Sequence, residues 1–297
     1  MQRRERPSDV RLYICGVRGS TPAPGPDFLR YGGHTSCIAA ARDGAHPTLI
    51  LDAGTGIRRV WHLLHGQPFR GSVLLSHLHW DHTQGLPFFR AGDDPDSRVD
   101  LYLPAQGGDP EEVLARGMSP PHFPIRPSQL RGRWRFHGLE EGEHDLEGFR
   151  VLAREVPHKG GRTFGYRVSD GGASFAYLSD HHPYGLGPGP EGYGEYHEAA
   201  RTLAEGVDLL VHDSQYTGPE FAERAHFGHS TTDFAVHLAE LAGCARLLLF
   251  HHDPPRTDAE LDAIVAGLQD RRVPVSAATE GDVIDLPLTP PGRGRRD

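Results

Sequence analysis

The chain has 297 residues, of which 37% are hydrophobic and 24% charged, and its formal net charge at pH 7 is −9. This length admits one large domain or two small ones, and the hydrophobic content is sufficient for a sizeable core. The negative charge disfavours an extended nucleic-acid surface, and no apolar run reaches the about 18 residues that a transmembrane helix needs.

The two ends of the chain are predicted to be flexible. Residues 1–10 are charged and no apolar stretch follows them, which argues against a secretory signal and favours a cytoplasmic protein with no membrane partner. Residues 289–297 combine Pro, Gly and Arg. Between them no long linker occurs, so residues 11–288 are predicted to form a single α/β domain. The three cysteines are far apart, without CxxC spacing, and are predicted to be unpaired buried residues.

Short apolar runs bounded by turn residues predict strands, and residues with helical periodicity predict helices. The strands expected in chain order cover residues 11–16, 36–41, 48–52, 73–76, 99–104, 148–156, 163–168, 175–180, 208–211 and 246–250. The helices expected cover residues 57–64, 110–117, 195–205, 232–241 and 257–269. Residues 83–89 are expected to form a helix or turn that packs aromatic side chains beneath a site.

The segment after the strand at residues 73–76 concentrates metal-binding side chains. His77, His79, Asp81 and His82 offer imidazole nitrogens and a carboxylate, which are ligands for divalent cations. Alternate residues of an extended chain share a face, so His77 and His79 point to one side and Asp81 and His82 elsewhere. This spacing predicts two metal positions. The alternative is a polar loop with chance histidines, in a chain that contains 20 of them.

Polar residues also follow other predicted strands. In layered α/β folds the strand ends at one edge build the site, so the recurrence indicates an edge site. The residues concerned are Asp52, Ser76-His77, His158, Asp180, His212-Asp213 and His251-His252. Two interpretations of Asp52 stay open: it caps the helix at residues 57–64, or its carboxylate orients a ligand histidine.

The spacing His77-x-His79-x-Asp81-His82 resembles the HxHxDH signature of the metallo-β-lactamase superfamily. The resemblance implies an α/β fold, a four-layer αββα sandwich of two mixed β-sheets flanked by helices, with a dinuclear site at one edge. It implies two divalent ions, Zn²⁺ or alternatively Mn²⁺. His252 competes with His251, but the spacing from the preceding strand fits His251 better. The implied ligands are His77, His79 and His158 for one ion and Asp81, His82 and His251 for the other, bridged by Asp180.

A second stretch resembles one branch of this superfamily. Residues 227–231 (FGHST) are similar to the HST motif of the ribonuclease Z and cyclic-nucleotide phosphodiesterase branch, in which this histidine protonates the leaving oxygen or binds the phosphate. The resemblance implies His229 as the acid, with Asp213 orienting it where the branch has Glu. Asp81 completes the implied catalytic residues. A carboxylate-oriented histidine is a sound general acid, and the alternative is that Ser230 caps the next helix.

The start of the chain resembles the same branch. Residues 16–20 (GVRGS) and 31–35 (YGGHT) are similar to a GxRGS…YGGNT pattern, with His34 where Asn is usual. No role is assigned to His34, to His122 or to His252. His181 and His182 are expected to lie behind the ligands or on the surface.

These observations predict hydrolysis of small phosphodiesters, with cyclic nucleotides favoured, by a bridging hydroxide of a dinuclear site. Residues 183–193 are Gly/Pro-rich but lack the basic arm typical of ribonuclease Z, which points to a small phosphodiester or nucleotide partner. The alternatives are a tRNA 3′-processing endonuclease and a non-catalytic nucleotide sensor. A homodimer is expected by analogy; residues 118–124 could contact the partner, form a lid or simply connect elements.

Overall fold

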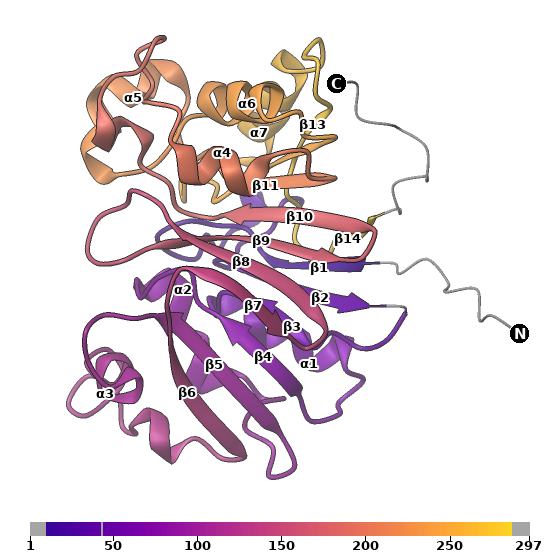
Figure 1. Cartoon of the computed structure of the whole chain (residues 1–297), viewed down its shortest axis with the longest axis vertical. Helices are drawn as coiled ribbons and strands as arrows, with labels where there is room; N and C mark the ends of the chain where they lie inside the picture. Colours follow the sequence, from indigo (N-terminus) through magenta and orange to yellow (C-terminus); the bar gives the residue numbers. More distant parts are fainter. Residues whose placement is uncertain (1–9, 43, 287–297) are drawn as a thin grey trace, which may run out of the picture.

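Two mixed sheets pack face to face in this computed structural model, which describes residues 10–286 except residue 43 (Figure 1). Each sheet has seven strands. In spatial order the first contains β14 (Val283–Leu286), β1 (Val10–Gly16), β2 (Cys37–Arg42), β3 (Leu49–Leu51), β4 (Arg70–Leu74), β5 (Arg98–Pro104) and β6 (Arg133–Leu139). The second contains β13 (Val275–Ala277), β12 (Leu247–Phe250), β11 (Leu209–Asp213), β10 (Ala173–Leu178), β9 (Phe164–Asp170), β8 (Phe149–Glu155) and β7 (Gly142–Leu146).

Helices cover the outer faces of both sheets. Figure 1 shows α4, α6 and α7 over the second sheet and α1 and α3 on the side of the first. The helices are α1 (Val60–Leu63), α2 (Trp80–Thr83), α3 (Pro110–Ala115), α4 (Glu198–Ala204), α5 (Gly218–Arg224), α6 (Thr232–Leu241) and α7 (Asp258–Gly267). The 3-10 turns are η1 (Pro26–Phe28), η2 (Thr55–Arg59), η3 (Leu86–Phe88), η4 (Pro127–Gln129), η5 (Pro183–Leu186) and η6 (Ala225–Phe227). No helix in residues 10–286, residue 43 aside, is long and apolar enough to cross a membrane.

Three apolar layers hold this sandwich together. The central one lies between the sheets and includes Leu12 of β1 and Tyr177 of β10. The other two lie under the helices: one joins Val73 of β4 to the η2–α1 segment, and the other joins Leu249 of β12 to Phe234 of α6. Burying side chains on both faces of each sheet requires cover on both sides, which gives four layers. The predicted αββα fold is confirmed.

The elements differ from the predictions mainly at their ends. The helix expected at residues 57–64 is a 3-10 turn followed by the single turn α1. β11 continues through Asp213, so His212 and Asp213 lie within the strand. The flexible ends predicted at residues 1–10 and 289–297 fall outside the described residues, except for Val10, which begins β1.

Candidate metal centre

The predicted ligands come from one edge of the sandwich. The loop after β4 carries His77 and His79 and continues into α2, and Asp180 and His251 follow β10 and β12. β10 and β12 both pair with β11 in parallel, so their carboxyl ends lie at the same edge. His158 reaches this edge from the chain after β8. Seven side chains far apart in the sequence therefore converge.

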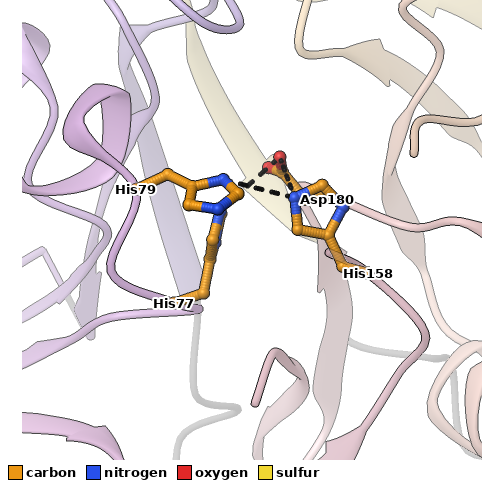
Figure 2. A group of neighbouring side chains, drawn as sticks. All are labelled: His77, His79, His158 and Asp180. Atoms are coloured by element: carbon orange, nitrogen blue, oxygen red, sulfur yellow. Dashed lines mark hydrogen bonds and ion pairs between the residues drawn. The ribbon is translucent and has the colours of Figure 1, made fainter. Parts of the chain in front are cut away.

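His77, His79, His158 and Asp180 form the first group, with one potential ligand atom from each within 4.8 Å of the others (Figure 2). His158 Nε2 lies 3.4 Å from His79 Nδ1 and 3.5 Å from Asp180 Oδ2. Burial lowers the pKa of His158 to about 4, so this imidazole is neutral at pH 7. A neutral imidazole has a lone pair free for a metal ion.

Asp81, His82 and His251 form the second group. His82 Nε2 lies 3.2 Å from Asp81 Oδ2, and His251 Nε2 is also 3.2 Å from that oxygen. Burial opposes a positive charge on His82, but the carboxylates of Asp81 and Asp180 raise its pKa well above the usual range. The centre of this group therefore favours a positive charge.

Asp180 lies between the two groups. Its Oδ2 is 3.7 Å from His77 Nε2, and its Oδ1 is 3.0 Å from His82 Nε2 and 3.2 Å from His251 Nε2. Both oxygens and His77 Nε2 are buried and make no hydrogen bond of regular geometry with the described residues. Buried polar atoms are normally satisfied, so this set of nitrogens and oxygens fits divalent metal ions.

Asp52 orients the ligands from behind and caps no helix. Its carboxylate accepts hydrogen bonds from Ser76 N at 2.6 Å, Ser76 Oγ at 2.8 Å and Tyr177 Oη at 2.8 Å, and its Oδ2 lies 2.8 Å from His82 Nδ1. This leaves Nε2 of His82 facing the other two members of the second group, Asp81 and His251. Of the two interpretations of Asp52, the geometry therefore supports the one that orients a ligand histidine.

His229 and Asp213 form a contact beside the two groups. His229 Nδ1 lies 3.1 Å from Asp213 Oδ2 and 3.7 Å from Asp180 Oδ2. Burial opposes protonation, but Asp213 and then Asp180 raise the pKa of His229 to about 9. His229 is also close enough to Asp180 and His251 to offer a ligand atom to an ion. The same side chain can thus donate a proton or bind a metal.

The cap of α6 is Thr231, whose side chain accepts a hydrogen bond from Phe234 N at 3.1 Å. The alternative interpretation, in which Ser230 caps this helix, is wrong. Ser230 N instead donates to Asp213 Oδ2 at 3.2 Å. The chain entering α6 is therefore fixed on the same carboxylate that contacts His229.

The histidines without an assigned role lie around the two groups. His252 turns away: its Nε2 lies 2.9 Å from Ala278 O, so the geometry favours His251 in the ligand group. His181 is buried, with Nδ1 3.0 Å from Nε2 of His212. His182 is half-buried, and His34 Nδ1 lies 3.1 Å from Thr55 Oγ1.

A cleft of about 1520 Å³ opens beside the first group, and His77 and Gly160 lie in its wall. Its other walls come from η2, α1, the α2–η3 segment and residues 113–123. Phe89 is buried as predicted, but Phe88 is 60% exposed and lines the cleft. The sequence interpretation missed this cleft, since its residues follow no motif.

Residues 48–252 match the model of a family described as a beta-lactamase superfamily domain. The chain belongs to this superfamily. Ribonuclease Z of Natronomonas pharaonis is 24% identical over an alignment that covers 94% of this chain and 98% of that protein. Ribonuclease Z of Limosilactobacillus reuteri is 25% identical, with 73% of this chain and 81% of that protein covered. This beta-lactamase superfamily member thus resembles the ribonuclease Z-like branch and is a metal-dependent hydrolase.

Solved structures of the superfamily share the fold. The short form of human tRNase Z aligns with a TM-score of 0.64 at 20% identity, covering 94% of this chain and 100% of that one. A diphosphatase from the PhnP family aligns with a TM-score of 0.67 at 19% identity, covering 94% and 98%. At these identities the likeness establishes the fold alone.

Proposed function

We propose that this chain is a phosphodiesterase whose dinuclear centre is held by the two ligand groups described above. The observation that carries the proposal is the pair of groups joined by Asp180, with His229 and Asp213 beside them. Two bound dications, Zn²⁺ or alternatively Mn²⁺, would lower the pKa of a water between them and stabilise charge on the phosphoryl oxygens.

His229 supplies the proton for the leaving oxygen. With Nδ1 directed to Asp213, the nitrogen left for the substrate is Nε2. The Asp213 carboxylate raises the pKa of His229, which favours the protonated ring that a general acid requires. Asp213 holds the ring in place and stabilises its charge. Asp81 also accepts a hydrogen bond from Ser20 N at 2.6 Å. This bond fixes the loop after β1, which faces the substrate.

Two substrates fit this chemistry. The negative net charge and the lack of a basic arm favour a small phosphodiester such as a cyclic nucleotide. The curated relatives named ribonuclease Z favour tRNA 3′ processing as the second candidate. A nucleotide sensor is the least supported alternative, because a pure binder has no need of the complete ligand set. The proposed enzyme is cytoplasmic and forms homodimers.

A substrate panel tests the proposal. Protein saturated with Zn²⁺ or Mn²⁺ should hydrolyse bis-p-nitrophenyl phosphate, and comparison of cyclic nucleotides with precursor tRNA should rank the two substrates. Cleavage of precursor tRNA with strongly salt-dependent binding would favour the second candidate. Absence of turnover of every phosphodiester, with both metals bound by elemental analysis, would refute the phosphodiesterase assignment.

A further inference from the structure

We propose that the cleft beside the metal centre is a binding subsite for the non-scissile part of a short single-stranded oligonucleotide. We call it the arginine groove, after Arg58, Arg59, Arg90, Arg116 and Arg162 in its walls. The inference rests on the proposed function, because it extends the substrate of the same centre. It also revises the expectation of a small phosphodiester, since the substrate would continue beyond one nucleotide.

The charge of the groove is opposite to that of the chain. The chain has 40 acidic and 31 basic residues, yet no Asp or Glu is among the described residues that line the groove. Arg59 pairs with Glu280, and Arg162 with Glu140 and Glu155. Within residues 10–286, residue 43 excepted, no carboxylate lies within 4.0 Å of Arg58, Arg90 or Arg116.

These three arginines are exposed. An exposed guanidinium without a carboxylate partner is available for a phosphate, with which it forms charge-assisted hydrogen bonds. Arg90 also lies over the ring of Trp61, 4.2 Å from its centroid, which holds the guanidinium in one position. The occupant of the groove is therefore anionic.

Aromatic side chains form another part of the arginine groove. Trp80 is 76% exposed and Phe88 is 60% exposed, and both line the groove. The ring of Phe123 meets that of Phe88 edge-to-face with centroids 6.0 Å apart, so residues 118–124 contribute to the same wall. Aromatic faces beside cationic side chains are the combination that binds single-stranded nucleic acid, by base stacking and phosphate contact.

The position and size of the groove connect it to the reaction. Its wall includes His77, and a Cβ on Gly160 would lie 2.7 Å from His79 Nε2. A phosphodiester at the metal centre can therefore continue directly into the groove. The volume of about 1520 Å³ exceeds the range of about 300–1,000 Å³ typical of small-molecule sites. A cyclic mononucleotide would leave much of this space unfilled.

A second copy of this chain is a poorer occupant. A two-fold contact places a surface patch against the same patch of the partner, so the arginine groove would face another set of arginines. Like charges across an interface oppose association. The charge of the groove thus favours a nucleic-acid strand over a partner subunit.

Fluorescence anisotropy with fluorescein-labelled hexauridylate tests the subsite directly. The metal-loaded protein would carry His229→Ala, so that the probe stays intact. Adding Arg58→Ala or Arg116→Ala should weaken binding about tenfold and reduce the salt slope of log Kd by about 0.7 per lost phosphate contact. Trp80→Ala should also weaken binding about tenfold, through loss of stacking.

The matched control is Arg272→Ala, an exposed arginine near β13 at the far edge of the second sheet, which should bind the probe within twofold of the parent. Arg58→Lys should restore much of the affinity, and melting temperatures should agree across the set. Equal probe affinity in the groove variants and the control would overturn the subsite. If the groove variants no longer dimerise in sedimentation but keep the probe affinity of the parent, the subsite proposal is overturned. The groove would then be a contact between copies of the chain.

The two proposals can fail separately. If the protein with His229 intact hydrolyses no phosphodiester while the groove variants still lose probe affinity, the phosphodiesterase assignment fails and the subsite stands. If hydrolysis proceeds and the kcat/KM ratio of a tetranucleotide to bis-p-nitrophenyl phosphate is the same in parent and groove variants, the subsite fails alone. The expected result is at least a tenfold fall in that ratio.

Discussion

Asp52 holds three elements together with one carboxylate. It bonds the loop after β4 through Ser76, α2 through His82 and β10 through Tyr177, and it is fully buried. Its φ of 59° is unusual for a residue other than glycine, so the backbone here is strained in order to aim the side chain. Ligand orientation and stability should therefore depend on the same residue.

Asp52→Ala should lower the free energy of unfolding by about 3 kcal/mol, because buried donors are left unpaired. It should also weaken metal binding by about 10- to 100-fold, because His82 loses its orientation. Asp258→Ala is the control: this buried carboxylate accepts from Arg30 N and Tyr31 N away from the centre. Urea unfolding and metal titration should show a stability loss in both variants and weaker metal binding only in the first.

Asp213 should set the alkaline limb of the pH–rate profile. His229 donates a proton only when charged, and the Asp213 carboxylate raises the pKa of His229, so that the ring stays charged to a higher pH than it would without Asp213. Asp213→Asn removes the largest interaction that raises this pKa, so activity should be lost at a lower pH than in the parent. Initial rates with measured metal content at each pH check this.

Asp253→Asn serves as the control, because this buried carboxylate pairs with Arg224 instead of His229. Its alkaline limb should match that of the parent. An unchanged limb in Asp213→Asn would contradict the role of His229 as the proton donor.

The convergence of the predicted ligand residues was easier to predict from the sequence than the surroundings of these residues. The spacing of His77, His79, Asp81 and His82 is local, and the resemblance supplied their distant partners. The role of Asp52 stayed open because its contacts come from Tyr177, 125 positions away, as well as from the nearby loop. A contact over that separation leaves no pattern in a single sequence.

At the scale of elements, the start of α6 fixes the proposed acid. Thr231 caps this helix two residues after His229, and Ser230 N bonds Asp213. Thr231→Ala should cost about 1 kcal/mol of stability through the lost cap. It should also lower kcat, because the backbone that holds His229 loosens.

Thr257→Ala is a matched control, since Thr257 caps α7 by accepting from Glu260 N at 3.3 Å. It should cost a similar free energy of unfolding and leave kcat unchanged. Thermal unfolding and steady-state kinetics of the two variants separate the effects. Equal kcat in both would contradict a positioning role for the α6 cap.

Strands and helices were predictable where periodicity and length agreed, as in α6. The ends were less predictable, because pairing decides them. β11 continues through His212 and Asp213 because these residues pair with β12, opposite Leu249 and Phe250. The segment at residues 57–64 begins as a 3-10 turn, where the chain lies tightly against β1 and β2.

At the scale of the whole molecule, both sheets contribute residues to the candidate metal centre. His77 and His79 follow the first sheet's β4, whereas Asp180 and His251 follow strands of the second. An ion bound to both sets links the two halves of the sandwich. Metal binding should therefore stabilise the fold as a whole.

Adding Zn²⁺ at about 100 times its Kd to protein stripped by a chelator should raise the free energy of unfolding by about 2.7 kcal/mol. The melting temperature should rise by about 5–10 °C. His251→Ala and His79→Ala should each reduce this gain, while His252→Ala should keep it, because His252 faces Ala278. Calorimetry with and without Zn²⁺ makes the comparison, and a normal gain in His251→Ala would contradict its assignment as a ligand.

The local positive charge of the arginine groove is a property of the whole molecule that the sequence alone does not reveal. Arg58, Trp80 and Arg116 belong to separate segments, and the net charge of −9 predicted no extended nucleic-acid surface. The local charge emerges only when the fold brings these segments to one cleft and leaves the acidic residues outside it. The proposed subsite therefore depends on local charge and not on the net charge of the chain.

The proposed reaction is phosphodiester hydrolysis at a dinuclear centre with His229 as the acid. The most direct test titrates metal-free protein with Zn²⁺ and measures both bound metal and bis-p-nitrophenyl phosphate hydrolysis, in the parent and in His229→Ala. We predict full activity at two ions per chain, and about 10²- to 10⁴-fold slower hydrolysis in His229→Ala with both ions retained. No hydrolysis in the parent with two ions bound, or loss of an ion in His229→Ala, would contradict the account.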